Sequence, residues 1–242
     1  MVKKITLLFS LVNAYHHYLH AQDNRFSGWS MYVHTIKITK NISSHLDVQL
    51  RSDDQVKNVE TFIFRPGINY HFKNKTIATA GYALIEGWRT ISGDRGAVAE
   101  HRIWQQYIIP QHINRLVINH RLRLEERFIP RSANQNGEIV KTQTVYNTRL
   151  RYFFRTIIPF KSATTFEKGP FFAIQNEVFV NVSNLQNVNK KFFDQNRAFG
   201  AIGWRVQKEF DLEAAYIYQY VSGLNSADVN NNILQLSAYL RL

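Results

Sequence analysis

The chain has 242 residues and no cysteine, which excludes a disulfide framework, a thiolate metal site and a cysteine nucleophile. Its net charge of +12 would ordinarily indicate nucleic acid or an anionic surface as a partner. The arginines, however, stand singly at alternate strand positions, so we expect no nucleic-acid partner. Near-average hydrophobicity argues against a helical membrane protein but not against a barrel, whose inward residues are polar.

The N-terminus has the layout of a secretory signal peptide. A short positive segment precedes the apolar core Ile5–Val12, and cleavage is expected after Ala21. A buried N-terminal helix or strand is the alternative, but the polar Asn13 and the histidines after it would interrupt a core helix. We therefore expect a signal peptide at 1–21 and one β-barrel domain at 22–242. No later stretch reaches the roughly 18 apolar residues of a membrane helix, so a membrane-spanning form must be a barrel.

The rest of the chain alternates apolar and polar residues over long runs, which predicts a series of antiparallel strands. The predicted strands are 29–40, 45–52, 59–72, 76–86, 99–109, 115–128, 141–158, 171–182, 194–206, 211–221 and 231–242. In 115–128 one face is mainly aliphatic, whereas the other carries four arginines. This run is longer than the roughly 9–11 residues with which a tilted strand crosses a bilayer.

The connections between the predicted strands alternate between short and long. Short turns follow residues 40, 72, 109 and 206, and long polar loops follow 86, 128, 182 and 221. Outer-membrane barrels have short periplasmic turns and longer external loops, and they have an even number of strands. The eleven predicted strands are therefore one short of an expected twelve, with ten as the alternative. The connection 159–170 is the candidate for a missed strand.

Four short motifs occur in order along the chain: Glu100–Gln106, Arg121–Phe128, Arg149–Tyr152 and Phe193–Arg197. Together they resemble a family of unknown function that is found mainly in Bacteroidota, and the resemblance covers nearly the whole mature chain. It implies an outer-membrane β-barrel with a signal peptide. The family brings no activity, substrate or catalytic residue.

If the aliphatic rows face lipid, the opposite rows face the lumen of the barrel. The residues expected to form a polar network there are Glu100, Arg102, Arg121, Arg123, Glu125, Arg149, Arg151, Glu177 and Arg197. Because the arginine fork can bind several carboxylate and amide partners at once, the network would fill a narrow barrel as a plug. The alternative is a narrow pore that favours anions. In the plug, Arg123→Leu should lower thermal stability by leaving a carboxylate unpaired.

Two other functional classes make different predictions. A barrel-embedded hydrolase needs a serine beside a histidine, and no serine pairs by spacing with His101, while His120 falls on the lipid row. The chain also contains no HExxH motif and no calcium loop, so we expect no catalytic residue, metal or cofactor. A secreted soluble β-barrel or β-sandwich binding protein would instead turn its arginines outward and leave the cell without detergent.

The preferred interpretation is an antiparallel up-and-down transmembrane β-barrel, integral to the outer membrane of a Gram-negative bacterium. Its expected partners are outer-membrane lipid, lipopolysaccharide and the barrel-assembly machinery. The sequence leaves the oligomeric state open.

Overall fold

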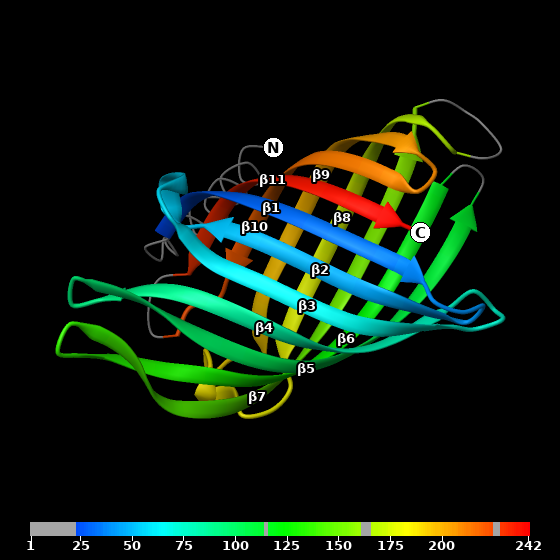
Figure 1. Ribbon diagram of the computed structural model, residues 1–242. Helices are drawn as coiled ribbons and strands as arrows, with labels where there is room; N and C mark the ends of the chain where they lie inside the picture. The colour runs from blue at the N-terminus through cyan, green and yellow to red at the C-terminus, as the bar shows by residue number, and fades with distance from the viewer. Residues whose placement is uncertain (1–22, 114–115, 161–165, 225–227) are drawn as a thin grey trace, which may run out of the picture.

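In the computed structural model the chain forms one closed β-barrel (Figure 1). The structure describes residues 23–113, 116–160, 166–224 and 228–242, so the predicted signal peptide at 1–21 lies outside the described part. Eleven strands in that part follow one another around the barrel, and each is antiparallel to the next. The predicted all-β barrel is therefore confirmed.

The strands are β1 (Asp23–Lys37), β2 (Ile42–Ser52), β3 (Val59–His71), β4 (Ile77–Ile91), β5 (Asp94–Ile113), β6 (Leu116–Gln135), β7 (Glu138–Pro159), β8 (Gly169–Asn181), β9 (Phe193–Gln207), β10 (Phe210–Val221) and β11 (Val229–Arg241). Two short 3-10 helices, η2 (Asp54–Val56) and η3 (Leu185–Asn187), lie in connections. No helix within the described ranges is long and apolar enough to cross a membrane.

The expected total of twelve strands, and the alternative of ten, are both wrong for the described residues. The first and last strands close the sheet by running parallel, with Asp23 opposite Val229 and Thr35 opposite Arg241. An odd number of strands requires this arrangement, because the first and last strands must then point the same way. The connection 159–170 adds no twelfth strand in its described residues, since β7 ends at Pro159 and β8 begins at Gly169.

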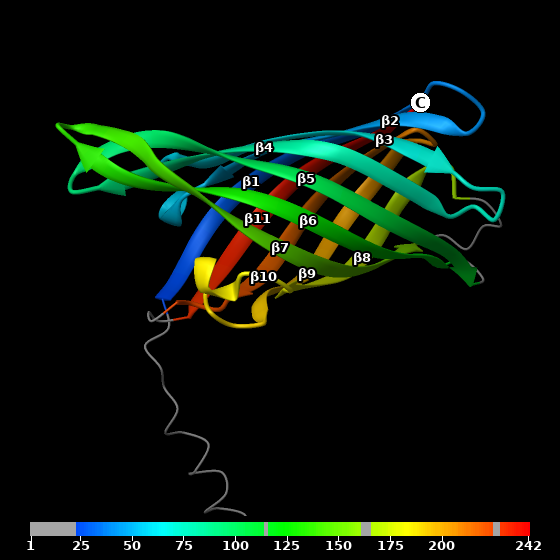
Figure 2. The same cartoon turned by 90° about the horizontal axis from the view of Figure 1, so that it is seen from below.

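Two of the predicted long loops, 87–98 and 129–140, are strand instead. β4 and β5 continue to the two-residue turn Ser92-Gly93, and β6 and β7 continue to Asn136-Gly137. Both residues of each turn have positive φ, as a type I′ hairpin turn requires. The resulting hairpins project beyond the barrel wall at one end, which we call the hairpin rim (Figures 1 and 2). Asn134 ties them together by donating to the Asp94 carboxylate at 2.7 Å.

The outer surface of the barrel is apolar, and the inner surface of the same strands is polar. On β11, Leu234 and Leu236 are 54% and 67% exposed, whereas Gln235 and Ser237 between and beside them are 6% and 4% exposed. A barrel in water alternates in the opposite sense, since its aliphatic side chains are buried inside. This inversion continues around the sheet.

One part of the barrel interior is apolar. β1 and β8–β11 contribute inward apolar residues that pack as one cluster, which we call the apolar cluster: Trp29, Phe171, Ala173, Phe199, Ala201, Ala215, Ile217 and Ile233. Its packing depends on a glycine, because a Cβ at Gly203 would lie 2.2 Å from the Phe171 ring. On the other side of the barrel, the ring of Trp104 lies over Gly81 in the same way.

Candidate functional site

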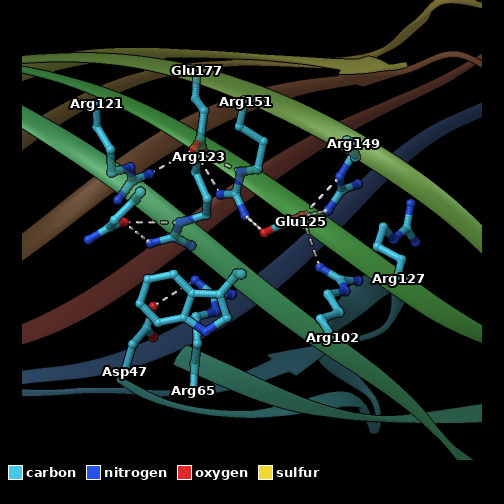
Figure 3. A network of polar contacts seen from close by, with 12 residues as sticks. Asp47, Arg65, Arg102, Arg121, Arg123, Glu125, Arg127, Arg149, Arg151 and Glu177 are labelled. Atoms are coloured by element: carbon cyan, nitrogen blue, oxygen red, sulfur yellow. Dashed lines mark hydrogen bonds and ion pairs between the residues drawn. The ribbon is translucent and has the colours of Figure 1, made fainter. Parts of the chain in front are cut away.

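The polar interior is organised around Glu125 on β6, whose carboxylate is reached by arginines from three directions (Figure 3). The β6–β7 register sets Glu125 directly opposite Arg149. Arg149 donates to the carboxylate at 2.6 Å, and Arg151, two positions further along the same face of β7, donates at 2.5 Å. Arg102 approaches from β5 at 3.4 Å. Glu125 is only 1% exposed, so these guanidinium groups take the place of its water.

The ion pairs continue to both sides of Glu125. Arg151 also donates to Glu177 on β8 at 2.7 Å, and Arg121 donates to the same carboxylate oxygen at 2.7 Å. In the other direction Arg149 reaches Asp194 at 2.8 Å. Arg149 and Arg151 each bind two carboxylates on different strands, so the network links the strands from β6 to β9 across the barrel interior.

A second carboxylate centre lies nearer the hairpin rim. Glu100 on β5 accepts from Arg102 at 2.7 Å and from Arg127 at 2.8 Å. Arg102 joins this centre to Glu125. Seven of the nine residues singled out in the sequence thus belong to one connected set of ion pairs: Glu100, Arg102, Arg121, Glu125, Arg149, Arg151 and Glu177.

The other two, Arg123 and Arg197, have no carboxylate partner among the described residues. Arg123 donates to the side-chain oxygen of Gln106 at 2.7 and 3.1 Å, and its guanidinium lies 4.7 Å from the Trp104 ring. Arg197 donates to the side-chain oxygen of Gln195 at 3.1 Å. The expectation that Arg123→Leu would leave a carboxylate unpaired is therefore wrong, because the partner of Arg123 is a neutral amide.

Besides Arg127 and Asp194, three further inward residues at the site were not in the predicted set. Asp47 on β2 accepts from Arg65 on β3 at 2.9 Å, and both are buried. Arg51, also on β2, donates to Gln49 at 2.6 Å and lies 3.9 Å from the Trp29 ring. The same alternation would have found Asp47 and Arg51, whereas the neighbouring Pro66 weakens the strand pattern around Arg65.

The lumen contains two cavities that meet at four arginines. The outer cavity, of about 360 Å³, lies toward the hairpin rim, and the inner cavity, of about 170 Å³, lies deeper in the barrel. The residues that line both are Arg51, Arg65, Arg151 and Arg197, which we call the arginine layer. The guanidinium groups of this layer border both cavities, so each cavity has positive charge in its wall.

His101 and His120 lie outside the lumen, whereas His45 lines the inner cavity. The ring of His120 lies on the outer surface, with its Nδ1 2.8 Å from the Tyr152 hydroxyl, and His101 is paired with Tyr82 on the same surface. Across the described residues, no cluster of three or more histidine, aspartate or glutamate side chains is arranged to hold a metal ion. Arginine side chains dominate the lining of both cavities and can bind anionic groups.

Comparison with known proteins agrees with the resemblance to a family of unknown function. The family described as "Protein of unknown function (DUF2490)" matches residues 26–230. No curated protein and no solved structure matches the chain. Since the matched region spans ten of the eleven strands completely or nearly so and enters the last, the chain belongs to the DUF2490 family.

Proposed function

We propose that this protein is an integral outer-membrane β-barrel whose lumen is closed by its arginine–carboxylate network. The observation that carries the proposal is the inverted alternation of the strands, with apolar side chains outside and charged side chains inside. A large apolar side chain left in water forgoes about 1.5–3 kcal/mol of burial, and soluble monomers rarely expose wide apolar patches. A hydrocarbon environment accounts for the outer surface, and the closed sheet leaves no unpaired edge in it.

The hairpin rim is proposed to face the outside of the cell. Outer-membrane barrels keep short turns on the periplasmic side and longer extensions outside. The hairpins of β4–β5 and β6–β7 project from this rim, and the connection after β8, which contains η3, lies at the same end. The outer cavity would then be open to the exterior, while the arginine layer would close the path behind it.

The first test is electrophoretic mobility of the outer-membrane fraction, with boiled and unboiled samples compared. We expect a heat-dependent shift in that fraction, because a folded barrel resists the detergent and migrates differently from the unfolded chain until it is heated. Recovery of the protein in the soluble fraction without detergent would overturn the proposal and favour the secreted binding protein.

The second test separates a plug from a pore and uses single-channel recording in planar bilayers. The plug predicts no steady conductance. Conductance with a preference for chloride over potassium would show instead a narrow anion-favouring pore, and the arginine layer would be its selective constriction.

The third test concerns orientation. An epitope inserted at the Asn136-Gly137 turn should be accessible to antibody on intact cells, whereas the same epitope inserted at the Lys73-Asn74 turn of the opposite rim should need permeabilised cells. The reverse pattern would show that the hairpin rim faces the periplasm.

A further inference from the structure

The inner cavity carries a large excess of positive charge. Seven arginines line it, against the two carboxylates of Asp47 and Glu177. Burying a charge in a protein interior is strongly unfavourable unless an opposite charge and hydrogen bonds compensate it. It therefore matters which of these seven arginines form an ion pair with a carboxylate of the protein.

Four of the seven are compensated. Arg65, Arg121, Arg151 and Arg155 each form an ion pair with a carboxylate. The remaining three, Arg51, Arg123 and Arg197, have no ion pair with any described residue, and each is held instead by the side-chain oxygen of one glutamine. An amide oxygen accepts hydrogen bonds but carries no charge, so three guanidinium charges stay unbalanced around one cavity.

These three guanidinium groups are held in place by aromatic rings. Arg51 and Arg197 both lie against Trp29, at 3.9 and 5.0 Å from the ring centroid, and Arg123 lies against Trp104. Ring faces attract cations without neutralising them. The groups thus keep a fixed geometry while their charge remains available to a ligand.

They also retain free donors. Arg123 is 1% exposed, and its Nη1 atom is buried with no hydrogen-bond partner among the described residues. The Nε atom of Arg197 is in the same state. A buried N–H group without an acceptor is destabilising, so both atoms favour a bound acceptor.

We propose that the inner cavity is a binding site for a small oxyanion of the phosphate or sulfate class, held by Arg51, Arg123 and Arg197. Several oxygens with more than one negative charge match several guanidinium forks better than a single chloride does. About 10–15 Å³ of cavity suffices for one water molecule, so 170 Å³ has room for such an ion with part of its hydration. Arg51 and Arg197 also line the outer cavity, so their positive charge faces both cavities.

This inference goes beyond the proposed function and does not rest on it, because it concerns the interior alone. It can be tested on the folded full-length chain from whichever cell fraction contains it. Failure of the membrane proposal would appear in fractionation, whereas failure of the oxyanion site would appear only in binding.

The experiment is isothermal titration calorimetry with sodium phosphate, and then with sodium sulfate, at constant ionic strength in chloride buffer. It is paired with thermal unfolding at increasing phosphate concentration. We expect saturable binding to the wild type and a melting temperature that rises with phosphate, since a ligand of the folded state stabilises it. Arg51→Gln and Arg197→Gln should each weaken the phosphate Kd by about 10- to 100-fold, the loss of one charged hydrogen-bonding group.

Arg25→Gln is the matched control, because it removes the same charge from an exposed ion pair outside both cavities. It should bind phosphate as the wild type does. A further signature is that Arg197→Gln, in chloride alone, should melt no lower than the wild type, since it removes an uncompensated buried charge. Arg123→Leu should behave likewise in chloride and should also lose phosphate binding.

Three results would overturn the site. The first is that the wild type gives no saturable heat with phosphate. The second is that Arg25→Gln loses as much binding as the interior variants, and the third is that the three interior variants bind phosphate as tightly as the wild type. If the interior variants do not fold, the wild-type titration and its melting curve decide the matter without them.

Discussion

The two sides of the barrel interior are filled by different means. Along β5–β8 the inward side chains are arginines and glutamates, and each buried carboxylate of the network has two or more guanidinium partners. Along β8–β11 and β1 the apolar cluster fills part of the interior, beside buried polar residues such as Asp211 and Glu213. Phe179 on β8 marks the border, because the guanidinium groups of Arg149, Arg151 and Arg197 all lie about its ring, at 5.1, 4.4 and 4.8 Å.

The stability of the two sides depends on different properties of their side chains. The ionic side depends on its buried carboxylates, because the loss of one leaves its guanidinium partners buried without an opposite charge. The apolar side depends on fitted volume, because its large rings lie against alanine and glycine. Substitutions that alter charge at constant size, or size without charge, should therefore affect the two sides unequally.

The largest effect is expected for Glu125→Leu, at about 3–5 kcal/mol of unfolding free energy, because it leaves the buried guanidinium groups around it uncompensated. Chemical denaturation in detergent, followed by tryptophan fluorescence, measures it. Glu126→Leu is the control: it makes the same change at the next residue of β6, which points to the other face and has no ion pair among the described residues. Equal losses in both variants would show that the ionic side is not held by pairing.

On the apolar side, Gly203→Ala should cost about 1–3 kcal/mol, because the new methyl group would overlap the Phe171 ring. Gly200→Ala lies on the same strand, where the nearest atom to an added Cβ is 3.9 Å away. It should be neutral or slightly stabilising, since alanine suits a strand better than glycine does. If both variants have the melting temperature of the wild type, close packing against Gly203 does not limit the stability of the apolar side.

The outer surface provides a third environment. His120→Phe removes the hydrogen bond between His120 and the Tyr152 hydroxyl and should cost about 0.5–1.5 kcal/mol. A double-mutant cycle with Tyr152→Phe isolates the coupling between the two side chains. A coupling as large as the loss in Glu125→Leu would contradict the claim that the interior pairs dominate stability.

The smallest effect is expected for the exposed pair of Asp23 and Arg25. Its N–O distance of 2.6 Å equals that of Arg149 and Glu125, but both of its side chains are more than 40% exposed. Exposed pairs contribute about 0–1 kcal/mol because water and salt screen them. Arg25→Gln should accordingly lower the free energy of unfolding by no more than about 1 kcal/mol. A larger loss would mean that distance, rather than burial, sets the strength of these pairs.

The sequence predicted the faces of the strands better than their ends. Strict alternation in 115–128 identified β6 and indicated which side chains share a face, because the side-chain period of a strand is two residues. It failed at the tips, where polar residues resemble a loop. Asn136-Gly137 between two alternating segments was the available signal, since this dipeptide is typical of a type I′ turn.

The partners within the site were harder to predict than its members. Alternation shows that Arg123 and Glu125 share a face, but the neighbour of each depends on the register of the adjoining strands. The β5–β6 register sets Arg123 opposite Gln106, so the arginine meets an amide. A shift of two residues in the β5–β6 register would have given Arg123 a different partner, and the pattern within a single strand does not determine the register.

The parallel contact of β1 and β11 has a consequence for the order of folding. Every other pair of neighbouring strands adjoins in sequence and can form as a local hairpin, whereas this seam joins segments some 200 residues apart, as in the hydrogen bond from Ser27 to Asn231 across 204 positions. Forming such a distant contact carries the highest loop-closure entropy in the chain, and parallel pairing is slightly less stable per residue than antiparallel pairing. We therefore expect the barrel to close last along this seam, whereas the ion pairs of the interior network, which join strands from β5 to β9, can form before the two end strands meet.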